Sequence, residues 1–188
     1  MMRARMAAAV SFSCVVCYCI ACETTTTTSD GTAPAVKPTQ GPTTPAGTIP
    51  NAIAITFAPK PADTNGNLLP DTLHVTSYLF ARPHPAPFFA EGSFHFSIYR
   101  MGTSGTPQLP ALDPLRAWVF DAAAVNAARS VALVGPCYEF ELSLLDDGGS
   151  DNLSVDSVDL VSWFEPIGTT DRVWLRGVRS VQFPKPMK

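Results

Sequence analysis

Residues 51–188 are predicted to form a mainly β domain, an antiparallel β-sandwich of about seven to eight strands with one short connecting helix. Three observations predict this fold class. Apolar and polar residues alternate with a period of two, the alternating runs recur at intervals of roughly ten residues, and turn-forming residues separate them. Polar outer faces favour antiparallel sheets, because parallel sheets are normally covered on both sides.

The alternating runs supply the predicted strands. The run 138–145 is the clearest, because Tyr138, Phe140 and Leu142 alternate with polar residues. The other strands are expected at 52–57, 72–80, 92–99, 116–120, 155–164, 172–175 and 179–183. The last two are expected to pair with each other as a hairpin across Gly177.

One segment departs from the β pattern. Residues 121–129 are rich in alanine, which has the highest helix propensity, and Asp121 is a suitable N-cap. Arg129 would suit the C-terminal end of such a helix, where the helix dipole favours a positive charge. We therefore expect a short helix here that connects two strands.

Residues 1–21 have the composition of a secretory signal peptide. Arg3 and Arg5 are the only charges before an apolar run that extends from Met6 to Ile20. This run is shorter than the roughly 20 apolar residues that a membrane-spanning helix needs. The amino end is therefore predicted to direct export.

The sequence Cys19-Ile20-Ala21-Cys22 closes this segment and resembles the lipobox of bacterial lipoproteins. The resemblance implies cleavage before Cys22, a lipid on Cys22, and anchoring to a membrane of the cell envelope outside the cytoplasm. One alternative is a secretory signal that is cut without lipidation, which would give a secreted protein. Another is a metal site at Cys14, Cys17, Cys19 and Cys22, which the apolar residues between these cysteines disfavour.

Residues 22–50 contain the proposed anchor cysteine and a stretch rich in threonine and proline. This composition buries little apolar surface, so the stretch is predicted to be a disordered linker. Its role is either that of a spacer or that of a carrier of O-glycans on threonine. From Cys22 onward the chain has 11 basic and 16 acidic residues, and this net charge of −5 argues against a nucleic-acid partner.

The stretch 63–71 spaces oxygen-bearing side chains along a turn-rich loop. It resembles the calcium loops of EF-hands, dockerins and thrombospondin type-three repeats, although Leu68 stands where the EF-hand pattern has glycine. The resemblance implies a calcium ion as the one cofactor, held by the side chains of Asp63, Asn65, Asn67 and Asp71 and the carbonyl of Leu69. The alternative is a metal-free turn, since Asp, Asn and Gly form turns on their own.

Trp163 and Trp174 are the candidate binding surface. Their strand neighbours are apolar and predicted to face the core, so the two indoles are expected to point outward. An exposed aromatic pair is typical of a contact surface for a protein or a glycan ligand. The alternative is that the two rings cover the edge of a sheet.

These features together predict an envelope-anchored binding or structural module, with no catalytic residues identified. The alternative function is an extracytoplasmic hydrolase or carbohydrate-processing enzyme. That function requires the carboxylates between Asp146 and Asp159 to converge with a histidine or a tryptophan in one cleft.

Overall fold

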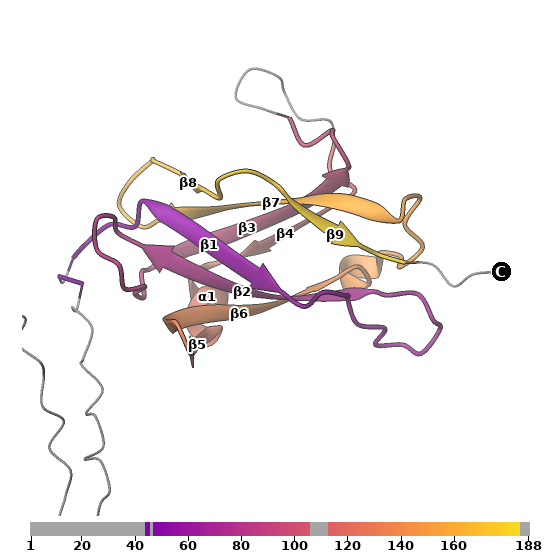
Figure 1. The fold of residues 1–188 in the computed structure, drawn as a ribbon, viewed down its shortest axis with the longest axis horizontal. Coiled ribbons are helices and arrows are strands. Elements are labelled where there is room, and N and C mark those ends of the chain that lie inside the picture. Colours follow the sequence, from indigo (N-terminus) through magenta and orange to yellow (C-terminus); the bar gives the residue numbers. More distant parts are fainter. Residues whose placement is uncertain (1–43, 46, 106–112, 185–188) are drawn as a thin grey trace, which may run out of the picture. The chain divides into compact units, whose positions relative to one another are not determined.

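A computed structural model describes residues 44, 45, 47–105 and 113–184 of the chain. These residues form two antiparallel sheets that face each other, with nine strands and one short α-helix (Figure 1). The elements are β1 (Ala52–Phe57), β2 (Thr72–Phe80), β3 (Gly92–Arg100), β4 (Arg116–Phe120), α1 (Ala122–Ala127), β5 (Arg129–Ala132), β6 (Gly135–Ser143), β7 (Ser157–Pro166), β8 (Val173–Trp174) and β9 (Arg179–Gln182). The predicted fold class, an antiparallel β-sandwich, is confirmed.

The first sheet has the strand order β1-β2-β6-β5, and the second has the order β4-β3-β7-β8 with β9 also paired to β7. Along each long strand the residues that face the other sheet are buried and their chain neighbours are more exposed. In β6, for example, Tyr138, Phe140 and Leu142 are buried, whereas Glu139 and Glu141 are exposed. The period-two alternation in the sequence therefore corresponds to alternation between a buried and an exposed face of the strand.

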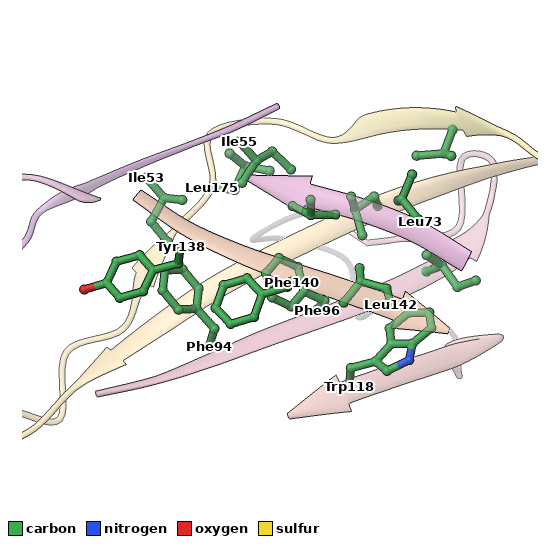
Figure 2. Close-up of a cluster of buried hydrophobic side chains, with 14 of the residues drawn as sticks. Ile53, Ile55, Leu73, Phe94, Phe96, Trp118, Tyr138, Phe140, Leu142 and Leu175 are labelled. Carbon is green, nitrogen blue, oxygen red and sulfur yellow. The ribbon is translucent and has the colours of Figure 1, made fainter. Parts of the chain in front are cut away.

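Aromatic rings fill the centre of the core (Figure 2). The ring of Phe94 on β3 lies 4.7 Å from that of Phe164 on β7, and 5.1 and 5.2 Å from those of Phe140 and Tyr138 on β6. These are the centroid separations at which tilted aromatic pairs attract one another. The cluster joins the two sheets, because β3 and β7 belong to one sheet and β6 to the other.

The short helix exists but ends earlier than predicted. It spans Ala122–Ala127, and the Asp121 side chain accepts a 2.8 Å hydrogen bond from the N–H of Ala124 as its N-cap. Arg129 does not end the helix but begins β5, a strand that was not predicted. The sequence pattern does not reveal β5, because this strand has only four residues and none of them is buried.

The predicted hairpin across Gly177 is wrong. Strands β8 and β9 do not pair with each other, because both pair with β7, at residues 163–164 and 157–160 of that strand respectively. Between them Leu175 leaves the line of the strand to bridge Ile53 on β1, and Gly177 takes a positive φ of 72°. Leu175 is buried there. Residues 173–182 therefore form an edge strand of the second sheet that is interrupted between β8 and β9.

Candidate functional site: an aromatic row on the outer face

Four side chains form a row across the outer face of the second sheet. The register pairs Val119 with His95, His95 with Trp163, and Trp163 with Trp174. Side chains alternate between the faces of a sheet, and Phe94 and Phe96 on either side of His95 point into the core. The row therefore faces away from the core, as predicted for Trp163 and Trp174.

We define the aromatic row as His95, Trp163 and Trp174. The rings of His95 and Trp163 are stacked, and those of Trp163 and Trp174 are tilted relative to each other. The centroids of His95 and Trp163 are 4.8 Å apart with their planes 9° from parallel, and those of Trp163 and Trp174 are 4.9 Å apart at 33°. These separations match the spacing between neighbouring strands, about 4.8 Å. The rings therefore stand upright on the sheet, with Trp163 between the other two.

This arrangement determines which ring a ligand can reach. Trp163 is covered on one side by His95 and on the other by Trp174, so mainly its edge is accessible. Trp174 ends the row and is 50% exposed, which is unusual for a large apolar side chain. Trp174 is therefore the ring that offers an open face.

A charged cluster lies beside the aromatic row. Glu165 accepts a hydrogen bond of 2.7 Å from Nε of Arg172 and one of 3.3 Å from Nε1 of Trp163. Its other carboxylate oxygen lies 3.4 Å from Nε2 of His95. The Arg172 guanidinium is 5.8 Å from the centre of the Trp163 ring, within the range of a cation–π contact. Glu165 thus holds the side chains of His95, Trp163 and Arg172 in place.

The protonation states of the cluster follow from this geometry. Burial lowers the pKa of His95 below its usual 6.5, and this effect outweighs the opposing charge of Glu165. Burial raises the pKa of Glu165, but the neighbouring His95, Trp163 and Arg172 together lower it below its ordinary value. At neutral pH the cluster therefore contains a neutral imidazole, one carboxylate and one guanidinium.

Ser93, His95 and Glu165 have the composition of a catalytic triad but not its geometry. The Ser93 hydroxyl lies 3.2 Å from Nε2 of His95, the same nitrogen that faces Glu165. In a triad, the nucleophile and the orienting carboxylate contact opposite nitrogens of the imidazole. This arrangement therefore gives His95 no separate orienting partner, and it suits a fixed surface better than nucleophilic catalysis.

The third tryptophan does not belong to this surface. Trp118 points into the sandwich, is 7% exposed, and donates a 2.9 Å hydrogen bond from Nε1 to the carbonyl of Ser143. Its position on β4 alternates with that of Val119, so only the latter can face outward.

The predicted calcium loop closes on itself through its own side chains. Asp63 accepts hydrogen bonds from the N–H groups of Gly66 and Leu68 at 2.7 Å, and the amide oxygens of Asn65 and Asn67 each accept one from the residue two positions on. Leu68 has a φ of 69°, in the left-handed region that glycine occupies more easily. Leu68 therefore occupies a left-handed position within a turn that the side chains of the loop hold closed.

Asp71 and Asp151 complete the surroundings of this loop. Asp71 is fully buried, and its carboxylate accepts hydrogen bonds from the N–H and hydroxyl of Thr64 and from the hydroxyl of Thr72 at 2.6–2.9 Å. Asp151, a residue the resemblance did not include, accepts hydrogen bonds of 2.9 and 2.7 Å from the side-chain amides of Asn65 and Asn67. The loop 63–71 and the loop that carries Asp151 are therefore fixed to each other.

The other candidate residues point to separate places. Asp159 accepts a hydrogen bond from the N–H of Gly102, whereas Asp151 faces the loop 63–71. His74 lies 3.5 Å from Glu141 on the first sheet, and His95 lies on the second. Two shallow hollows, of about 470 and 360 Å³, lie beside β4 and over the outer face of β2 and β6. Neither of them contains the aromatic row.

Comparison of the chain with family models, with known proteins and with solved structures finds no match. Within the described residues, no helix is long and apolar enough to cross a membrane. Cys22 and most of the linker 22–50 lie outside the described residues.

Sequence reasoning missed His95, Glu165 and Arg172 as partners of the tryptophans. His95 and Glu165 come together only because β3 pairs with β7 in one particular register. No local pattern encodes that register. Arg172 could have been suspected, because it lies two residues before Trp174 on the same face of an expected strand.

Proposed function

We propose that this protein is an envelope-anchored binding module whose ligand contacts the outer face of β3, β7 and β8. The observation that carries this proposal is the aromatic row, which ends in a half-exposed indole beside an ion pair. A solvent-facing tryptophan supplies a large apolar contact area, and the Glu165–Arg172 pair supplies hydrogen-bonding groups next to it. This combination suits a glycan or a polar protein segment of the envelope.

The row also favours binding over catalysis. Glu165 is ionised and already paired with Arg172, and His95 is packed against Trp163. A general acid or base needs a free path to its substrate and a pKa near the working pH. The cluster is instead a rigid arrangement of the kind that holds a ligand without chemical change.

The binding proposal is tested by co-sedimentation of the protein with purified cell-wall sacculi. We expect Trp174→Ala to weaken binding at least about fivefold, because it removes the one open indole face. His74→Ala, on the outer face of the first sheet, is the matched control and should bind as the wild type does. Equal binding by the two variants would refute the assignment of this face.

We further propose that one calcium ion stiffens the loop 63–71. Asp63, Asn65, Asn67 and the carbonyl of Leu69 would hold the ion with Asp71, whose carboxylate also accepts hydrogen bonds from three donors. Support comes from Asp151, which adds a carboxylate beside Asn65 and Asn67. Millimolar calcium should then raise the melting temperature of the wild type but not that of Asp63→Asn. An unchanged wild-type melting temperature would exclude the ion.

A further inference from the structure

The hairpin of β5 and β6 ends in an apolar tip. A two-residue turn, Leu133–Val134, joins the strands, and its side chains are 104% and 59% exposed. Val131, in the strand that leads into the turn, is 73% exposed. Three large aliphatic side chains within four residues are therefore placed in solvent, although burial of each would be favourable.

The fold itself does not require these residues at the turn. Two-residue hairpin turns favour asparagine, aspartate and glycine. Here the positive φ falls on Gly135, at 130°, and neither Leu133 nor Val134 has a positive φ. Polar residues would form the same turn, so their apolar character calls for a contact outside the sandwich.

The tip lies at the end of the sandwich where the chain enters from the linker. The connection 81–91 contacts the start of β1, the start of β6 and the turn after β7, so all three lie at this end. Asn51, just before β1, exchanges hydrogen bonds of 2.8 and 3.0 Å with the backbone of Arg82. Gly135 lies against Pro87, and the N–H of Ile167, after β7, donates a 3.0 Å hydrogen bond to the carbonyl of Glu91. We call this the tether end.

Exposed apolar residues concentrate at the tether end. Besides the hairpin tip, Ile49 is 61% exposed just before β1, and Ile167 is 64% exposed at the turn after β7. These residues come from both sheets and from the linker junction. At the opposite end of the described domain, the exposed large apolar side chains are Leu68 and Met101.

We propose that the tether end rests on the lipid bilayer, with Val131, Leu133 and Val134 inserted into its interface. This inference rests on the proposed envelope anchor, because the chain that leads back to Cys22 leaves the sandwich at this end. Arg129 is the only charged residue between 129 and 137, and its positive sign suits anionic headgroups. Apolar side chains at a protruding tip bind a membrane surface by entering its headgroup region.

The test measures how deeply the tip is shielded in membranes. The processed, anchored chain is reconstituted into phosphatidylethanolamine–phosphatidylglycerol vesicles with an environment-sensitive dye on Val134→Cys or on Met101→Cys. Cys137 is buried and does not compete for the dye. We expect iodide to quench the dye at position 134 about threefold less than at position 101.

Equal quenching at positions 134 and 101 overturns the proposal. Leu133→Cys labels the fully exposed residue of the same turn, and equal quenching at positions 133 and 101 would likewise overturn it. Failure of the anchor is a separate result. If mass spectrometry finds Cys22 unmodified, Cys22 and any retained upstream cysteine are replaced by serine before labelling, and these labelled chains are mixed with vesicles. Shielding of position 134 alone then supports the tip, and shielding of neither position refutes it.

Discussion

At the scale of single residues, buried polar groups fasten the loops to the sandwich. Tyr138 reaches out of the core so that its hydroxyl donates to the carbonyl of Ala90 and accepts from its N–H, at 2.9 and 2.8 Å. Asp71 does the same for the loop 63–71 through Thr64 and Thr72. Each of these side chains fixes a connection to the sandwich through hydrogen bonds.

Replacing Asp71 with asparagine tests the second of these anchors. Asp71→Asn keeps the size of the side chain but removes its charge, and hydrogen bonds to charged groups contribute about 1.5–3 kcal/mol each. We expect the free energy of unfolding to fall by about 2 kcal/mol at pH 7, measured in urea with chelator present. Asp171→Asn, at an exposed loop position, is the control and should be near neutral.

The same carboxyl predicts a pH dependence. Burial raises the pKa of Asp71, but the hydrogen bonds from Thr72 and Thr64 outweigh it and lower the pKa below 3.8. The stabilisation is therefore complete above pH 3.8 and is lost as the pH falls through the lower folded value. Asp71→Asn should lack this part of the acid-induced loss of stability. Parallel acid profiles for wild type and variant would contradict the assignment.

Replacing Tyr138 with phenylalanine tests the first anchor. Tyr138→Phe leaves the ring in the core but removes both hydrogen bonds to Ala90, which should lower the free energy of unfolding by about 1–3 kcal/mol. Tyr78→Phe, on the outer face of the first sheet, is the control. If both variants unfold at the same denaturant concentration as the wild type, the hydroxyl of Tyr138 contributes nothing to stability.

At the scale of elements, the close contact of β3 with β7 depends on Gly92. A Cβ atom at this position would lie 2.3 Å from the carbonyl oxygen of Glu165 and 2.4 Å from the ring of Phe164. Both neighbours are fixed, the first as backbone and the second as a ring buried in the core. The strands can therefore approach only because residue 92 has no side chain.

Gly92→Ala should accordingly destabilise the protein by about 2 kcal/mol or more, because the added methyl group forces β3 away from β7. Chemical denaturation measures this change. Gly102→Ala is an imperfect match because of its positive φ, but a Cβ atom there meets nothing within 4 Å, so it separates backbone strain from overpacking. A smaller loss in Gly92→Ala than in Gly102→Ala would contradict the packing argument.

Local pattern predicted every strand of the described domain except β5. The clear alternation in β6 identified that strand, whereas β5, with no buried residue, was missed. Gly177 indicated a hairpin turn, but the burial of Leu175 against β1 decided the pairing instead. The outward direction of Trp163 and Trp174 followed from their neighbours. Their partners depend on the long-range register between β3 and β7, which no local pattern reveals.

At the scale of the whole molecule, the two sheets of the described domain enclose one core. The two candidate contact surfaces lie on different parts of its exterior. The aromatic row occupies the outer face of the second sheet, and the apolar hairpin tip lies at the tether end. On a membrane-anchored chain, this arrangement would place the row on the flank of the domain. The two proposals therefore involve different surfaces, and each is testable without the other.

The central claim, that the domain is held at the cell envelope through a lipid on Cys22, is tested most directly by mass spectrometry of the protein isolated from its native cells. The account predicts a chain that begins at Cys22 and carries the mass of covalently attached acyl chains. A chain that begins at Met1 and bears no lipid would contradict it.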